Sequence, residues 1–323
     1  MKRLLICLLL CALLLSCGNK ALKDDCGCFM DYDEAISYSQ KHNTPLLVFF
    51  TEEDNDYISE KLVKNILKDP QFKTQIASKY TVLHLDFSAE FFQKTVAPDN
   101  ATEKQQEEAN TYTIIMQNNY TLSVFFNINE RPGVFLCTKE GYVVDRLEDL
   151  ENVSTLSDFK NLLDSENAKL EKINSFLKDS KRGSNVSKVE AIHSVLIATA
   201  SEYRAFLLPL INYALELDPE NKSGLCGTFI HSQADIEAMS LYSQGDLDGA
   251  VQKYLTAANN EFVKVEEKQE CLYTAAYLAV YNGSTDYEGI VSLLQIALEI
   301  APQSSKAESI QKAIDFFENK SEE

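Results

Sequence analysis

The chain has 323 residues, of which 45% are hydrophobic and 24% are charged, a composition typical of a folded globular protein. Its 49 acidic residues outnumber its 30 basic residues, and the formal net charge is −19. Such a surface repels nucleic acid, which excludes a nucleic-acid-binding function. The length is enough for two domains.

The first residues have the form of a secretory signal. Lys2 and Arg3 precede an apolar run over residues 4–15, which is shorter than the roughly 20 residues that a membrane-spanning helix needs. Residues 14–17 (LLSC) resemble the lipobox of bacterial lipoproteins, in which a small residue precedes the cysteine that is acylated. The resemblance implies a signal peptide over 1–16 and a palmitate-type lipid on Cys17. It also implies an exported protein of the bacterial cell envelope, anchored to a membrane on its periplasmic or surface face. The alternative is an ordinary signal peptide with a chance cysteine.

Residues 17–31 are expected to be a lipidated tether, and strands and helices alternate from 32 to 178. Apolar spacing predicts helices over residues 33–42, 56–68, 70–80, 106–119 and 155–178. Apolar runs and a hairpin turn at 139–141 predict strands over residues 46–51, 81–87, 133–138 and 142–146. The polar stretch 88–105 is expected to be a loop. This order of elements predicts a layered α/β domain.

Two segments of this domain resemble the thioredoxin fold. Residues 35–62 (AISYSQKHNTPLLVFFTEEDNDYISEKL) resemble exported thioredoxin-like proteins, in which an apolar strand leads to a turn that carries a Cys-x-x-Cys pair. Residues 131–136 (RPGVFL) resemble the step at which thioredoxins keep a cis-proline beside the active site. The resemblance implies a central mixed sheet flanked by helices over residues 32–178, with Pro132 beside the degenerate site.

The chain departs from this family at the active-site turn. Counted from Phe50, the two family cysteines fall on Asp56 and Ser59. Thiol–disulfide exchange needs a thiolate and a resolving thiol, and neither is present there. Asp56 is instead suited to cap the following helix. We therefore predict no catalytic residue at this turn, no cofactor and, on balance, no enzyme.

Other cysteines leave alternatives open. Cys26 and Cys28 are separated by one glycine and form the one reactive-looking motif, because a strained disulfide between them would be easily reduced. They could equally be idle. Cys137 lies on a predicted strand and is expected to be inert, whereas Cys226 and Cys271 could form a bridge. Four scattered His residues give no zinc spacing, so no metal is predicted.

A linker is expected over residues 179–188, and residues 189–323 carry helical spacing throughout. Residues 234–258 resemble a tetratricopeptide repeat. The small and large residues of that repeat's spacing pattern fall on Ala238, Ala250, Tyr254 and Ala257. Partial echoes lie at 211–219 and 290–302. The resemblance implies an all-α repeat domain with an interaction surface, and the alternative is a generic helical bundle.

These features favour a non-catalytic binding or adaptor module with a protein or peptide partner. Several aromatic residues precede Pro132, where an apolar peptide could dock or the rings could simply form core: Tyr112, Tyr120, Phe125 and Phe126. One rival is a thiol–disulfide oxidoreductase that uses Cys26 and Cys28, which would require those thiols to lie near Pro132 and Asp56. Another is a structural envelope lipoprotein.

Overall fold

The computed structural model describes residues 21–321 and divides into two compact units. The expected signal peptide and Cys17 lie outside the described residues. The first unit takes in residues up to Asn174 together with 199–203, and the second takes in Ser175–Ala198 and the residues from Arg204 onward.

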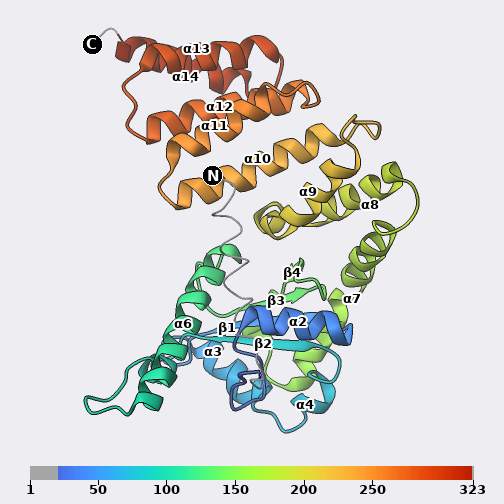
Figure 1. Cartoon of the computed structure of the whole chain (residues 1–323), viewed down its shortest axis with the longest axis vertical. Helices are drawn as coiled ribbons and strands as arrows, with labels where there is room; N and C mark the ends of the chain where they lie inside the picture. Colours follow the sequence, from blue (N-terminus) through green and yellow to red (C-terminus); the bar gives the residue numbers. More distant parts are fainter. Residues whose placement is uncertain (1–20, 322–323) are drawn as a thin grey trace. The chain divides into compact units, whose positions relative to one another are not determined.

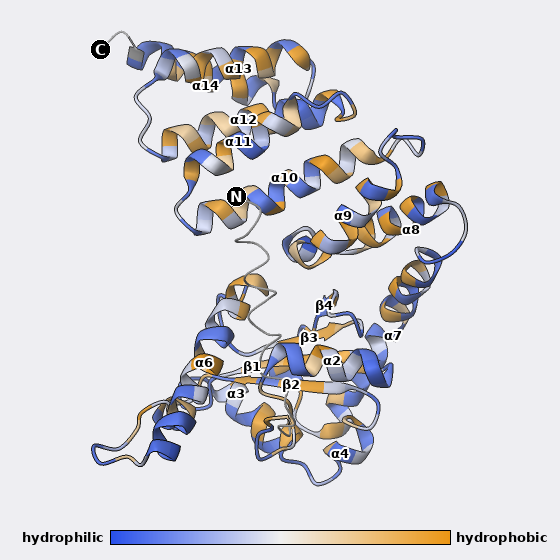
Figure 2. Cartoon of the chain, in the orientation of Figure 1, coloured by the Kyte–Doolittle hydropathy of each residue, from blue (hydrophilic) through white to orange (hydrophobic). Residues whose placement is uncertain are grey.

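The first unit is built on a four-stranded mixed sheet in the order β2-β1-β3-β4. The central strand β1 (Leu46–Thr51) pairs in parallel with β2 (Thr81–Asp86) and antiparallel with β3 (Gly133–Cys137), and β4 (Val143–Arg146) pairs with β3. Every residue of β1 and β3 is buried, which explains their continuous apolar sequences. Figure 2 shows this apolar concentration along the strands.

Helices cover both faces of this sheet. Phe49 of β1 packs against Phe159 of α7 (Leu156–Asp179), with ring centroids 5.5 Å apart. Phe50 points to the other face and packs against Phe126, which directly follows α6 (Glu103–Phe125). Phe126 also contacts Tyr32, the first residue of α2 (Tyr32–His42). The predicted thioredoxin-like arrangement, a mixed sheet between helices, is confirmed (Figure 1).

The helices between β1 and β2 differ from the sequence prediction. The helix predicted over 56–68 is α3 (Tyr57–Leu62) continued by a π-helical turn, η2 (Val63–Leu67). Of the helix predicted over 70–80, only α4 (Phe72–Gln75) is helical, and the rest of that segment forms turns.

The stretch predicted as a loop over 88–105 contains a helix, α5 (Ala89–Lys94). Ser88 caps it by accepting a hydrogen bond from the backbone N–H of Phe91, and Phe91 buries its ring against Tyr112 of α6. The loop prediction is wrong there because one serine cap and one buried aromatic residue are enough to form a short helix.

Residues 21–31 are not a free tether. Phe29 forms a parallel bridge with Leu83 of β2, donating to the Val82 carbonyl and accepting from the His84 N–H. Its ring is 3% exposed and packs against Tyr38 of α2. The tether expectation is wrong for this part because Phe29 and its backbone extend the sheet at the outer edge of β2.

The second unit is helical, as the sequence predicted. Helices occupy half of the expected linker, because α7 runs to Asp179 and α8 already begins at Asn185, which leaves a turn over residues 180–184. The helical elements are α8 (Asn185–Ala198), η4 (Ser201–Leu207), α9 (Leu208–Leu217), α10 (Cys226–Ser243), α11 (Leu247–Ala258), α12 (Val265–Tyr281), α13 (Tyr287–Ile300) and α14 (Ala307–Ser321). The first residues of η4 belong to the first unit, where Tyr203 packs edge-on against Phe135.

Helices α10 to α14 pack one against the next (Figure 1). Small residues line their shared core, including Ala238, Ala250 and Ala257, and this allows close approach of the helices. Asp246 and Asp286 cap α11 and α13 in the same way, each accepting the backbone N–H of the glycine three residues on. Two successive hairpins thus share their turn chemistry, and the finer resemblance to tetratricopeptide repeats stays a prediction.

Candidate functional site

The turn after β1 leads directly into α3, where the fold's thiols would normally lie. Asp56 is the N-cap of α3, and its carboxylate accepts the backbone N–H of Ser59. Ser59 is fully buried, and its hydroxyl makes no hydrogen bond to any residue that the structure describes. Both positions therefore serve the helix start, and neither presents a nucleophile.

The loop before β3 faces this turn through an ion pair. The Arg131–Pro132 peptide bond is cis. The Arg131 guanidinium donates to the Glu52 carboxylate at 2.7 Å and lies 3.8 Å from the ring centroid of Phe87. The hydrogen bond from Asn55 is the main cause that lowers the pKa of Glu52, with Arg131 adding to it, so this carboxylate stays ionised.

Aromatic side chains continue from Arg131 onto α6. Phe87 packs edge-on against Tyr120, with centroids 5.2 Å apart. Tyr120 and Val124, on α6, are 55% and 72% exposed. Arg131, Phe87, Tyr120 and Val124, with Glu52, form what we term the Arg131 surface. It offers a cation on an aromatic ring beside an exposed apolar stripe, which is suited to contact a peptide.

Cys26 and Cys28 lie in a tight turn just before Phe29, which pairs with the outer edge of β2. The Asp24 carboxylate accepts the backbone N–H groups of both cysteines, at 3.0 and 2.8 Å. Phe29, which follows them, lies outside β2, three strand spacings or about 14 Å from β3 and its preceding Pro132. The structure therefore does not bring these thiols together with the cis-proline.

The electrostatic surroundings of these thiols disfavour thiolate. Burial, with the Asp24 charge second, raises the pKa of Cys26 to about 11. Burial also raises the pKa of Cys28, which is only 2% exposed. At neutral pH only about one Cys26 in ten thousand would be ionised, so its nucleophilic reactivity is low.

A buried polar chain that the sequence did not reveal pins this turn to the sheet. His84 of β2 hydrogen-bonds through Nδ1 to the Asp24 carboxylate at 2.7 Å and through Nε2 to the Thr51 hydroxyl at 2.8 Å. The order resembles a catalytic triad, but Thr51 is fully buried and His84 is 6% exposed. No substrate can reach the hydroxyl, so these three hydrogen-bonded side chains have a structural role and hold the Asp24 turn against the sheet. The three residues are too far apart in sequence for any motif to reveal them.

The remaining thiols are unpaired, and no cluster for a metal exists among the described residues. Cys137 is fully buried in β3. Cys226 and Cys271 are not bridged, and the Cys226 thiol donates to the Asp218 carbonyl oxygen. In the described part of the chain we find no helix with the length and apolarity that crossing a membrane requires.

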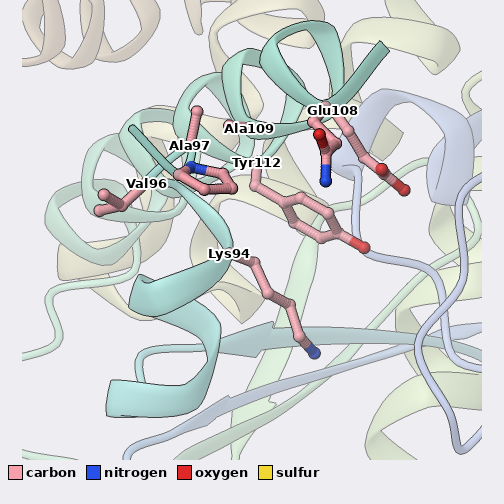
Figure 3. A pocket seen from close by; sticks show the side chains of 8 residues that line it. Lys94, Val96, Ala97, Glu108, Ala109 and Tyr112 are labelled. Atoms are coloured by element: carbon pink, nitrogen blue, oxygen red, sulfur yellow. The ribbon is translucent and has the colours of Figure 1, made fainter. Parts of the chain in front are cut away.

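A shallow hollow of about 310 Å³ lies where α5 and the following turn meet α6 (Figure 3). Its polar lining residues are Lys94, Gln105, Glu108 and Tyr112, and its apolar lining residues include Val96 and Pro98. No His or Cys is among its lining residues, so it lacks the groups of a catalytic centre in this fold.

Fold and site together define a thioredoxin-like domain, with Asp56 and Ser59 at the turn after β1, followed by a helical region. A family model of the thioredoxin-like domain matches residues 32–157. A second model, described as an uncharacterised protein C-terminal domain, matches residues 225–323.

Two individual proteins are also similar. An uncharacterized protein of Treponema pallidum (strain Nichols) is 30% identical over 101 residues, which cover 31% of this chain and 34% of that protein. The match thus spans about a third of the relative's length. A solved structure of DsbH oxidoreductase superposes with a TM-score of 0.32 and 18% identity, covering 46% of this chain and 85% of that chain.

Proposed function

We propose that this protein is a non-catalytic thioredoxin-fold adaptor of a bacterial cell envelope, lipid-anchored through Cys17, which binds a protein or peptide segment on the Arg131 surface. The observation that carries this proposal is the state of Asp56 and Ser59. One is committed to a helix cap and the other is a buried hydroxyl, so the site has no redox chemistry to offer.

The Arg131 surface supplies what a binding site needs. Stacking on Phe87 and pairing with Glu52 hold the guanidinium in place, so binding costs little side-chain entropy. Tyr120 and Val124 expose apolar area beside it that a partner can bury. A peptide with an apolar side chain and a hydrogen-bond acceptor fits this combination.

The rival function, an oxidoreductase based on Cys26 and Cys28, fits the geometry less well. Phe29, which follows these cysteines, bridges to β2, whereas the cis-proline precedes β3 on the other side of β1. The raised pKa of Cys26 further slows attack on a disulfide. An insulin-reduction assay separates the two functions. We expect wild type and a Cys26→Ser/Cys28→Ser double variant to be equally inactive. Activity that the double variant loses would establish the oxidoreductase instead.

Site-specific photo-cross-linking tests the Arg131 surface. A benzophenone amino acid at Tyr120 should cross-link a partner in the native envelope, and Arg131→Glu should abolish that product. The same probe at Tyr38, which is 41% exposed on α2, is the matched control and should give none. Equal cross-linking at both positions, or at neither, would reject this surface as the binding site.

Membrane attachment is tested separately from binding. Cells fed an alkyne-tagged palmitate should label wild type but not a Cys17→Ser variant, which should leave the membrane fraction. A labelled protein that stays in the membrane yet gives no cross-link at Tyr120 would favour the third possibility, a structural envelope lipoprotein.

A further inference from the structure

The second unit has its own pocket, formed by side chains of α10 and α12. Its volume is about 310 Å³. We term it the tyrosine pocket, and its lining residues are Met239, Tyr242, Thr274, Tyr277, Leu278 and Tyr281. Five of these six side chains are apolar or aromatic, which is typical of a site for an apolar group.

The tyrosine pocket is exposed to an extent that is unusual for large apolar residues. Met239, Tyr277 and Tyr281 are 57%, 45% and 74% exposed. The rings of Tyr242 and Tyr281 lie 6.0 Å apart. Together with Tyr277 they present aromatic ring surface to a ligand. Such aromatic faces attract both apolar side chains and cations.

Acidic residues precede the tyrosine pocket on both helices. Asp235 lies four residues before Met239 on α10, and Glu270 lies four residues before Thr274 on α12, so each shares a helix face with the pocket. His231 approaches Asp235 at 3.6 Å and Glu270 at 3.9 Å. Lys306 pairs with Glu270 at 2.5 Å, which leaves Asp235 as the less compensated carboxylate.

The Asp235 carboxylate is accessible to an incoming cation. Its side chain is 45% exposed, and Glu270 places a second carboxylate beside the same His231 ring. From residue 204 onward the sequence has more than twice as many acidic as basic residues, which draws basic partners to this unit.

We propose that the tyrosine pocket and Asp235 together bind a short peptide segment of a partner protein that carries an aromatic or large aliphatic side chain and, two positions away, a lysine or arginine. Met239 is the pocket residue of α10 that lies nearest to Asp235 in sequence, and the four residues between them give a helix rise of about 6 Å. Two residues of an extended peptide span about 6.6 Å and can therefore reach from Asp235 to the Met239 end of the pocket. The inference rests on the proposed adaptor function and adds the chemistry of the partner.

A peptide array tests this specificity without knowledge of the natural partner. Short glycine–serine peptides with two variable positions, separated by one serine, sample all pairs of amino acids and are probed with the purified full chain. We expect signal to concentrate on pairs of an aromatic or aliphatic residue with lysine or arginine. The strongest peptide is then measured in solution by fluorescence anisotropy.

Matched variants assign the two contacts. Tyr281→Ser should weaken binding about tenfold, whereas Phe316→Ser, which removes a 56% exposed aromatic side chain of α14 outside the pocket, should not change it. Asp235→Asn should weaken binding of the lysine peptide at least threefold but leave its glutamine analogue unaffected. Glu308→Gln, at an 81% exposed side chain of α14, is the charge control.

Three results would overturn the inference. They are an array with no preference for a basic residue, binding that Tyr281→Ser leaves intact, and equal losses from the pocket variants and their controls. Failure of the cross-linking at Tyr120 would leave this result untouched, since that position belongs to the first unit. The outcome for the helical pocket is therefore distinguishable from that for the Arg131 surface.

Discussion

Ser59 is a buried residue of α3 whose hydroxyl has no hydrogen-bond partner among the described residues. Burial of an unpaired hydroxyl costs free energy, and alanine keeps the rest of the packing. We expect Ser59→Ala to raise the free energy of unfolding of the first unit by about 1 kcal/mol, measured by hydrogen exchange of the β1 and β3 backbone amides in a urea series.

Ser39 provides the matched control for Ser59. It is equally buried on α2, but its hydroxyl donates to the Thr44 carbonyl oxygen, which would lose its partner. Ser39→Ala should lower stability by about 1–3 kcal/mol. If both variants are destabilised alike, the Ser59 hydroxyl has a partner, such as a buried water, and is not the unpaired group inferred above.

Glu52 makes the first unit's stability depend on pH. Its pKa is lowered in the folded state, chiefly by the Asn55 hydrogen bond and then by Arg131. A depressed carboxyl pKa contributes stability above the unfolded value of about 4.3, and this contribution is lost as pH falls through the folded pKa. At pH 7 we expect the free energy of unfolding of wild type to exceed that of Glu52→Gln by less than about 1 kcal/mol, because the Glu52–Arg131 pair is partly exposed.

That difference should stay constant from pH 7 to about 5 and shrink below it. Urea titrations at a series of pH values measure it, with Glu60→Gln on the exposed side of α3 as the control. A difference that instead grows as the solution is acidified would contradict the assignment of the Glu52–Arg131 pair.

At this scale, sequence spacing predicts positions but not partners. Counting from Phe50 placed Asp56 at the start of a helix, because a cap depends only on its neighbours in the chain. The ion pair of Glu52 with Arg131 joins residues 79 positions apart. Neither residue type demands the other, so only the folded chain reveals the pair.

At the scale of elements, the segment before α2 depends on Asp24. Its carboxylate accepts two backbone N–H groups and pairs with His84, and these bonds hold Cys28 in the interior. Asp24→Ala leaves those donors unsatisfied, at about 1–3 kcal/mol each, so the segment should open far more often. We expect alkylation of Cys28 by iodoacetamide, followed by mass spectrometry, to accelerate at least tenfold.

Asp25→Ala is the neighbouring control, since that side chain is exposed. It should leave Cys28 protected. Comparable labelling in wild type, Asp24→Ala and Asp25→Ala would mean that residues 21–31 behave as the free tether that the sequence first indicated.

The packing of α10 depends on Gly227. A Cβ added there would lie 2.7 Å from the carbonyl carbon of Phe262 and 3.0 Å from the Cα of Val263, both backbone atoms that cannot easily move. Gly227→Ala should therefore destabilise the second unit by about 2 kcal/mol or more. A Cβ added at Gly245 has no described atom within 4 Å, but the alanine would have to adopt the φ of 79° that the glycine has there. Gly245→Ala should therefore lower the free energy of unfolding by only about 1 kcal/mol. Thermal melts that rank the two the other way would show that α10 can shift to make room.

Elements with strong local patterns were predictable, and those that depend on tertiary contacts were not. The apolar run of β1 was found residue for residue because burial on both faces leaves only its last residue, Thr51, polar. Helix α5 was missed, since only Ser88 and Phe91 mark it in a polar stretch. Residues 21–31 were assigned to a tether because a single bridging residue, Phe29, carries no periodic pattern.

At the scale of the molecule, two units with separate cores and separate family matches should respond separately to mutation. Ser59 lies in the first unit and Gly227 in the second, and substitutions at sites without shared partners add in their effects. We expect the Ser59→Ala/Gly227→Ala double variant to show the sum of the single changes to within about 0.5 kcal/mol.

Calorimetry should resolve this sum into two transitions, one raised by Ser59→Ala and the other lowered by Gly227→Ala. Each variant is the control for the other, because Ser59→Ala should leave the transition of the second unit unchanged and Gly227→Ala should leave that of the first unit unchanged. A single transition that both variants shift would show that the chain unfolds as one cooperative body. A partner seated on the Arg131 surface would then change the stability of the tyrosine pocket as well, and the two binding sites of the adaptor would be coupled rather than independent.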